Sequence, residues 1–395
     1  MRFRLYPSAA QRVLLLEQCG HARYVWNLGL EQRLMWRRWK GPTPGFNAQA
    51  AQLTAARAAQ PWLACGSQIV QQQALRDLDR AWRNFFAGTH RRPKWRRAGQ
   101  DEGLRIVGPQ ALRVRQDNRA RSSVLVPKIG WVSFKVGRVL VDWKSYRITR
   151  DRAGHWHIAF AVIPDPIPAP CNGEVVGVDR GVTVAVALST GQMSSPAGLR
   201  LKESERLLRL QRRLARARRG SNRRKKVKTL VGQMKARDGD RRKDWVEKTT
   251  TDLARRFDVI RVENLNVKAM TRSARGTVEN PGRHVAQKAG LNRGILKSGW
   301  GQLVTRLEQK ALGRVEKVTA AYTSQTCNAC KHIASESRKS QAAFVCVACG
   351  HRANADVNAA RNIAAGQAVT ARGDPRVLAR SVKREPQHAR PPKVA

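Results

Sequence analysis

The chain has 395 residues and carries 76 Lys and Arg against 28 Asp and Glu, a formal net charge of +48. Its hydrophobic content of 42% is enough to build packed cores, which excludes a wholly disordered basic tail. The charge also excludes an isolated enzyme acting on small neutral substrates, because self-repulsion would destabilise such an enzyme to no purpose. A polyanion normally neutralises a chain of this kind, and nucleic acid is the leading candidate, ahead of an anionic membrane.

No segment of the chain resembles an export signal or a membrane span. The first residues lack the apolar region of a signal peptide, and no run of about 18 apolar residues occurs. The seven cysteines are an odd number in a chain without a signal peptide, which argues against a disulfide framework. We therefore expect a soluble protein that is not exported.

Two helices are predicted in the first hundred residues. The first begins after Ser8, which forms a capping-box pattern with Gln11, and apolar residues then recur every three to four positions over 15–34. A glycine-containing break at 41–45 ends it, and the second helix covers about 67–85. Stripes of this kind indicate core packing.

A basic segment with an aromatic residue follows the second helix, at 90–97. Positive charges beside a tryptophan suit phosphate contact combined with base stacking, although a solvated loop has the same composition. The candidate nucleic-acid contacts in this segment are Arg91, Arg92, Lys94, Trp95 and Arg96.

Short β-rich runs dominate from 103 to 163. Strands are predicted at 124–126, 131–134, 139–141, 146–148 and 156–162, the last two joined as a hairpin through Ala153 and Gly154. Residues 1–163 therefore read as a small antiparallel barrel or sheet with a helical insertion at about 10–100. Four prolines then form a stiff linker at 164–172, where we place the main domain boundary.

An α/β pattern follows the linker. Strands are predicted at 174–179, 183–188, 258–263 and 315–318, and helices at 245–257 and 295–312. Between them, a helical segment at 200–245 holds 19 Lys and Arg against 5 Asp and Glu. A solvated helix face or a packing seam could account for it, but we favour nucleic-acid contact. The densest block of charge is Arg223, Arg224, Lys225 and Lys226.

Four cysteines follow the pattern C-x2-C-x15-C-x2-C, the spacing of a zinc ribbon with four thiolate ligands. They are Cys327, Cys330, Cys346 and Cys349. We expect one structural Zn²⁺, with redox-active pairs as the alternative. His332 and His351 lie nearby, but four thiolates already satisfy the metal.

Three carboxylates stand out because acids are scarce in this chain. Asp179 and Glu263 each end an apolar strand, and Asp356 lies at the start of an Ala- and Asn-rich helix after the ribbon. Any one of them alone reads as a helix cap or a solvated group. Together they predict a site for divalent cations, suited to two-metal phosphodiester hydrolysis with two Mg²⁺ or, alternatively, Mn²⁺.

Five short motifs resemble the TnpB family, the OrfB-type proteins encoded by bacterial insertion sequences and related to the smallest type V CRISPR effectors. They are Phe3-Arg4-Leu5-Tyr6-Pro7, Gly177-Val178-Asp179-Arg180-Gly181, Val262-Glu263-Asn264-Leu265, Thr323-Ser324-Gln325-Thr326-Cys327, and the ten residues from Asn354 to Ile363. The resemblance covers about residues 1–365. Lys331 departs from it, because a glycine often follows the first cysteine pair in the family.

The resemblance implies an α+β multidomain fold. Its RNase H-like (RuvC) nuclease domain would occupy 173–322 and contain the basic segment 200–245. A zinc ribbon that binds target nucleic acid would occupy 323–352, and a last RuvC helix 353–365. A wedge β-barrel with an inserted helical recognition lobe would occupy 1–163, and 366–395 would be a disordered basic tail.

The resemblance also implies an activity: RNA-guided, metal-dependent cleavage of double-stranded DNA beside a short adjacent motif. Asp179, Glu263 and Asp356 would be the catalytic, Mg²⁺-binding carboxylates, and the four cysteines the zinc ligands. The partners would be a guide RNA and the DNA target, and the location the bacterial cytoplasm, at the nucleoid when bound to DNA.

Three other readings stay open. A miniature type V CRISPR effector has the same architecture, and only a neighbouring repeat array or transposon end would distinguish the two. An RNA-guided repressor is disfavoured because all three acids are present. A transposase that joins DNA through a tyrosine is disfavoured because none of the four tyrosines lies beside a His-hydrophobic-His metal pair.

Overall fold

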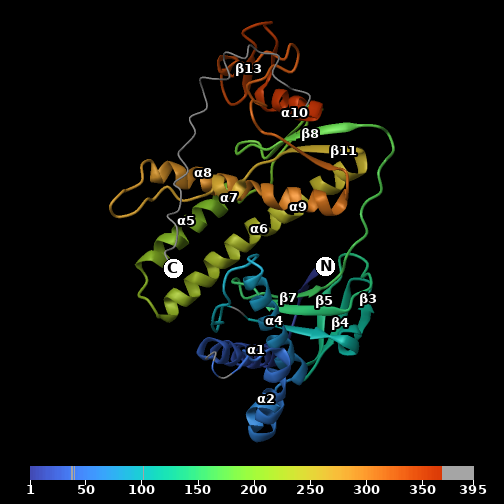
Figure 1. The fold of residues 1–395 in the computed structure, drawn as a ribbon, viewed down its shortest axis with the longest axis vertical. Coiled ribbons are helices and arrows are strands. Elements are labelled where there is room, and N and C mark those ends of the chain that lie inside the picture. The colour runs from blue at the N-terminus through green and yellow to red at the C-terminus, as the bar shows by residue number, and fades with distance from the viewer. Residues whose placement is uncertain (37–38, 40, 101, 367–395) are drawn as a thin grey trace. The chain divides into compact units, whose positions relative to one another are not determined.

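The computed structural model describes residues 1–36, 39, 41–100 and 102–366, which fall into two compact units (Figure 1). One unit combines Met1–Pro164 with Arg200–Ala236, and the other combines Asp165–Leu199 with the chain from Arg237 onward. The basic tail predicted at 366–395 lies outside the described residues, except for its first position. In the described part, no helix is both long and apolar enough to cross a membrane.

An antiparallel sheet organises the first unit. Its described strands run in the order β2-β6-β7-β1-β5-β4-β3. Their bounds are β1 (Arg2–Leu5), β2 (Gly103–Val107), β3 (Val114–Asn118), β4 (Arg121–Val126), β5 (Gly130–Lys135), β6 (Ser145–Arg150) and β7 (Trp156–Phe160). The predicted hairpin is confirmed, because β6 pairs with β7 around Gly154 at φ 85°. The rings of Phe3, Phe134 and Phe160 meet in the core beside the sheet.

The strand predicted at 139–141 is wrong. The chain between β5 and β6 is an irregular connection, with Val139 83% exposed. Leu140 and Trp143 pack against the core from this connection, and the Trp143 Nε1–H donates to the Ala111 carbonyl at 2.8 Å. A further strand could pair only with an edge strand of this sheet, and the described edge strands are β2 and β3, not the neighbouring β5 and β6.

Helices cover the sheet of the first unit. In α1 (Ala9–Met35) the predicted capping box is present, since Ser8 Oγ accepts from the Gln11 N–H at 3.2 Å and Gln11 Oε1 accepts from the Ser8 N–H at 3.0 Å. The second predicted helix is α4 (Gln68–Phe86). Sequence patterning missed α2 (Phe46–Ala59) and α3 (Pro61–Cys65), because α2 is rich in Ala and Gln and has no apolar stripe.

The basic segment is helical, as predicted. It forms α5 (Leu201–Arg216) and the first part of α6 (Asn222–Arg256), and the helix predicted separately at 245–257 is the last part of α6. On α5 the expected apolar seam buries only Leu210, whereas the first part of α6 buries Val227, Val231 and Met234.

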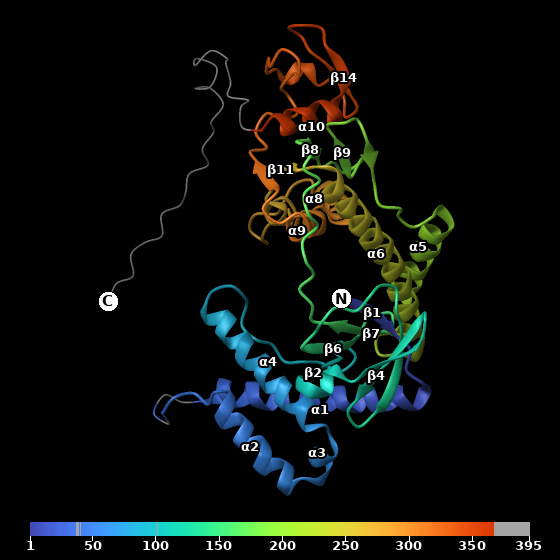
Figure 2. The ribbon, with the colours of Figure 1, turned by 90° about the vertical axis from the view of Figure 1, so that its right-hand side faces the viewer.

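A mixed sheet organises the second unit, with its described strands in the order β10-β9-β8-β11-β12. The bounds are β8 (Val175–Asp179), β9 (Val186–Leu188), β10 (Met193–Ser194), β11 (Val259–Glu263) and β12 (Val315–Val318). β11 runs parallel to both β8 and β12, and β9 returns antiparallel to β8 as expected. The last helix, α10 (Ala355–Ala365), lies against β8 (Figure 2).

Two helices replace the single one predicted at 295–312. They are α8 (Val285–Ser298) and α9 (Trp300–Lys310), and Gly299 divides them in the left-handed conformation, with φ 78°. A short helix, α7 (Val267–Met270), precedes them. Two further strands, β13 (Ala343–Val345) and β14 (Arg352–Asn354), form the small hairpin of the cysteine-containing segment.

Candidate active site and metal centre

The three predicted acids come together at the carboxyl ends of β8 and β11, two inner strands of the mixed sheet. Val178 of β8 lies opposite Val262 of β11 in the parallel register, so Asp179 and Glu263 leave the two strands side by side. Asp356 lies in the first turn of α10, where the Asn354 side chain caps the helix by accepting from the N–H groups of Asp356 and Val357. The strand ends and the helix start therefore converge.

Gly177 explains how α10 comes so close to β8. A Cβ atom at this position would lie 2.0 Å from the Ala360 carbonyl oxygen and 2.4 Å from the Ala364 nitrogen. Only a glycine lets the helix backbone rest directly on β8. Gly177 thus lets α10 pack closely on β8, which brings Asp356 near Asp179.

All three acids have raised pKa values, and burial is the first cause for each. Burial, together with the nearby charges of Glu263 and Asp356, raises the pKa of Asp179 to about 7. Burial also raises the pKa values of Glu263 and Asp356 above their ordinary range. Three half-buried or buried carboxylates that disfavour their own ionised forms are a donor set for a hard divalent cation, whose charge would remove the repulsion. The chemistry of these side chains therefore suits a hard divalent cation such as Mg²⁺.

Two arginines border the acids, and sequence reasoning overlooked both. Arg180 is 6% exposed and donates to the backbone carbonyl of Glu263, joining the ends of β8 and β11. Arg338 donates to Asp356 Oδ1 at 3.4 Å and lowers the pKa values of all three acids through its charge. Arg180 could have been found from the sequence, because it directly follows Asp179. Arg338 could not, because no sequence pattern surrounds it in the ribbon.

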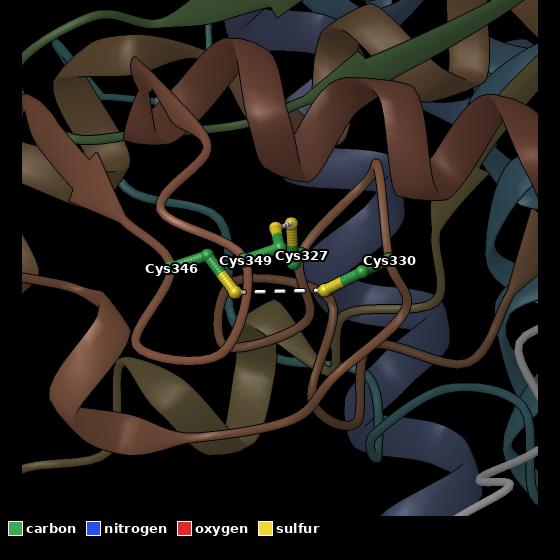
Figure 3. Close-up of side chains that lie close together, drawn as sticks. All are labelled: Cys327, Cys330, Cys346 and Cys349. Atoms are coloured by element: carbon green, nitrogen blue, oxygen red, sulfur yellow. Dashed lines mark hydrogen bonds between the residues drawn. The ribbon is translucent and has the colours of Figure 1, made fainter.

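The four predicted cysteines form a compact cluster whose sulfurs point toward one another (Figure 3). All four Sγ atoms lie within 4.8 Å of one another, with Cys327 and Cys349 at 3.8 Å and Cys330 and Cys346 at 3.6 Å. Tetrahedral zinc with Zn–S bonds near 2.3 Å requires sulfur separations of about 3.8 Å. The cluster fits one Zn²⁺ held by four thiolates.

The two cysteine pairs have matching backbones. Cys327 and Cys346 each accept, through their carbonyl oxygens, from the N–H four residues on at 3.0 Å. Those residues, Lys331 and Gly350, both adopt positive φ angles, 63° and 68°. Lys331 therefore occupies a left-handed position that suits glycine, and the turn keeps its shape despite the side chain.

The first basic segment is anchored to α1. The Arg96 guanidinium lies 3.8 Å above the Trp26 ring, and Asn27 bonds the Arg96 backbone in both directions. Trp95, by contrast, is 47% exposed, and Arg91, Arg92 and Lys94 are exposed as well. Arg96 is thus held against Trp26, whereas the other four candidate residues are exposed.

The second basic block divides in the same way. Arg224 is half-buried and donates to the carbonyl oxygens of Leu214 and Ala217, which end α5. Its neighbours Arg223, Lys225 and Lys226 are exposed.

Sequence profiles of three families match the chain. The profile described as "Helix-turn-helix domain" matches residues 1–40, the one described as "Probable transposase" matches 157–274, and "Cas12f1-like, TNB domain" matches 300–363. The third match contains the four cysteines and Asp356, whereas the second contains Asp179 and Glu263.

Full-length relatives extend these matches. A protein of Escherichia coli (strain K12) named "Putative RNA-guided DNA endonuclease InsQ" is 34% identical over 392 residues, 98% of this chain and 96% of that protein. A Streptomyces pristinaespiralis protein named "Putative RNA-guided DNA endonuclease" is 29% identical over 408 residues, 98% of this chain and 96% of that protein. The "CRISPR-associated endodeoxyribonuclease Cas12f1" of Sulfoacidibacillus thermotolerans is 48% identical over 63 residues, 16% of this chain and 15% of that protein.

Proposed function

The chain belongs to the TnpB family, and on that premise we propose that it is a transposon-encoded, RNA-guided DNA endonuclease that cleaves double-stranded DNA beside a short adjacent motif. The observation that carries the proposal is the meeting of Asp179, Glu263 and Asp356 at the carboxyl ends of β8 and β11. A repressor would have no need for three neighbouring acids whose burial disfavours the ionised form.

We assign catalysis to these three carboxylates as ligands of Mg²⁺, with Mn²⁺ as a possible replacement. When bound, the two metal ions would activate water and stabilise the leaving oxygen of the phosphodiester. The protein's own part is to hold the carboxylates in place. β8 and β11 supply two of them from adjacent strands, and α10 supplies the third from a capped first turn.

Arg338 would act beside the acids on the substrate. Its guanidinium reaches Asp356 from the ribbon and is 31% exposed, so part of it can contact a phosphate. A cation at this point would stabilise the charge that develops on the phosphate during cleavage.

Replacing Arg338 tests that role. We expect Arg338→Ala to slow guided cleavage by roughly 10²-fold, the usual effect of losing one stabilising group in an active site. Arg338→Lys keeps the charge but loses the forked geometry, so it should recover only part of the rate. Single-turnover cleavage on guide-loaded protein measures both, and equal rates for Arg338→Ala and the unmodified protein would contradict the assignment.

The mixed sheet with α10 supports an RNase H-like (RuvC) nuclease domain at 173–322 and 353–365, interrupted by a zinc ribbon at 323–352. The antiparallel sheet of the first unit supports the wedge domain, and α1 to α4 its recognition lobe. In this proposal Zn²⁺ shapes the ribbon and takes no part in the chemistry, because four thiolates leave it no open position.

The partners would be a guide RNA and a double-stranded DNA target. The formal charge of +48 supplies the phosphate attraction, and base pairing with the guide would read the DNA sequence. A substrate of genomic DNA would place the protein in the bacterial cytoplasm, at the nucleoid when it is bound. A miniature CRISPR effector is the related alternative, and a transposon end beside the gene would argue against it.

Charge reversal at the exposed part of the second basic block tests nucleic-acid contact. We expect Arg223→Glu, Lys225→Glu and Lys226→Glu together to weaken binding of the guide RNA or the DNA and to lower the salt slope of log K by about 2 to 3, since each phosphate contact contributes about 0.7–0.9. Binding assays over a range of salt concentrations measure this, and an unchanged slope would show a merely solvated surface. Arg224 is left intact because its guanidinium donates to the carbonyl oxygens at the end of α5.

The whole proposal is tested by co-expression with the flanking genomic DNA. RNA that remains bound to the purified protein is sequenced, and a plasmid library matching that RNA is then offered with Mg²⁺. Guided cleavage supports the nuclease function. Guided binding without cleavage would favour the repressor, and the absence of any defined RNA would contradict RNA guidance.

A further inference from the structure

Thr323 contacts the active site from the segment that leads into the ribbon. Its hydroxyl oxygen lies 2.8 Å from Glu263 Oε1 and 3.2 Å from the Ala320 carbonyl oxygen. The hydroxyl has one proton to donate, and an ionised carboxylate is a stronger acceptor than a backbone carbonyl. The bond to Glu263 is therefore the favoured one whenever that acid is ionised.

The backbone around Thr323 is fastened to α10. Asn362 donates through its side-chain amide to the carbonyl oxygens of Thr323 at 3.0 Å and Thr326 at 2.7 Å. Asn358 donates to the Thr326 carbonyl at 2.8 Å and accepts from the Asn328 N–H at 2.9 Å. Both asparagine side chains are buried, at 1% and 0% exposure. The segment 323–328 is thus held by the helix that also carries Asp356.

These contacts form one continuous link between two of the acids. It runs from Asp356 along α10 to Asn362, through the Thr323 backbone, and from the Thr323 hydroxyl to Glu263. Glu263 otherwise reaches its position from β11, a different element from α10. Without the hydroxyl, the side chain of Glu263 would be restrained by packing and by the charges of Arg180 and Arg338, with no hydrogen bond from Thr323.

We infer that Thr323 is a positioning residue of the nuclease site. It fixes Glu263 Oε1 relative to α10 and leaves the other carboxylate oxygen for the cation. This inference rests on the proposed function. Groups that orient metal-binding side chains typically contribute 10- to 100-fold to metal affinity or activity. Losing the Thr323 hydroxyl should therefore weaken cation binding without unfolding the chain.

The experiment compares Thr323→Val, which removes the hydroxyl and keeps the shape, with Thr323→Ser, which keeps the hydroxyl. Guide-loaded protein without DNA is titrated with Mn²⁺, and free Mn²⁺ is followed by electron paramagnetic resonance. We expect Thr323→Val to raise the Mn²⁺ dissociation constant, and the Mg²⁺ concentration for half-maximal cleavage, by about tenfold or more. Thr323→Ser should stay within about twofold of the unmodified protein, as the same hydrogen bond can form.

Zinc content and melting temperature show whether each variant is folded. If Thr323→Val loses zinc, Thr323→Ala carries the same test, since it removes the hydroxyl without adding bulk. Unchanged Mn²⁺ affinity in a folded variant without the hydroxyl would overturn the inference, and so would equal losses in the Ser and Val variants. Asp179→Asn runs in parallel: if the unmodified protein neither binds Mn²⁺ through Asp179 nor cleaves guided DNA, the proposed function itself fails.

Discussion

Asp179→Asn should abolish guided cleavage and at the same time stabilise the metal-free protein. The amide keeps the size of the side chain but cannot balance the charge of a divalent cation, so the rate should fall by at least 10³-fold, more than the loss of one stabilising donor. The folded state without metal gains because the buried acid that repels Glu263 and Asp356 is gone. Single-turnover cleavage and thermal melting, each with and without Mg²⁺, measure the two effects.

The same substitution changes the pH dependence of stability in a defined direction. Folding raises the pKa of Asp179 from 3.8 to about 7, so the folded state holds its proton more tightly than the unfolded state does. The metal-free protein should therefore lose stability as the pH rises from about 4 to about 7, by at most about 4 kcal/mol from this group. Asp179→Asn should flatten that loss, and Mg²⁺ should reduce it in the unmodified protein only. A variant that melts earlier than the unmodified protein at pH 8 without metal would contradict the clustered arrangement.

Cys346→Ala should release the zinc and, as a consequence, displace Asp356 from the other two acids. Three thiolates remain, and loss of one ligand from a closed four-thiolate site removes much of the metal's contribution to folding. The first cysteine pair is bonded to α10 through Asn358, so the disturbance should reach the acid at the start of that helix. We expect zinc content near zero by atomic absorption, early melting of the second unit, and severe loss of cleavage.

Cys65→Ala is the matched control, since this exposed cysteine lies outside the cluster. It should keep both zinc and activity. Full zinc content in Cys346→Ala would show that the ligand assignment is wrong. Normal cleavage by a zinc-free variant would show instead that the ribbon does not hold Asp356.

Local patterns were sufficient to predict most elements and the candidate residues. The capping box at Ser8 and the hairpin around Gly154 were predictable because each depends on residues close together in the chain. The cysteine spacing indicated a metal cluster for the same reason, since each pair forms its own tight turn. The acids could be selected because carboxylates at the ends of apolar strands are conspicuous in so basic a chain. The errors fell where local composition is ambiguous, as in Val139 to Val141.

Only the tertiary structure could show how these residues meet. The parallel register places Glu263 beside Asp179 across 84 positions of sequence, and Gly177 permits α10 to bring Asp356 onto them. No periodicity records that Arg338 reaches the acids or that Thr323 bonds to Glu263, because a single hydrogen bond between distant segments leaves no repeating pattern. The sequence by itself determined which chemical groups this protein holds, whereas the packing of α10 and the ribbon on the sheet decided which of them lie together.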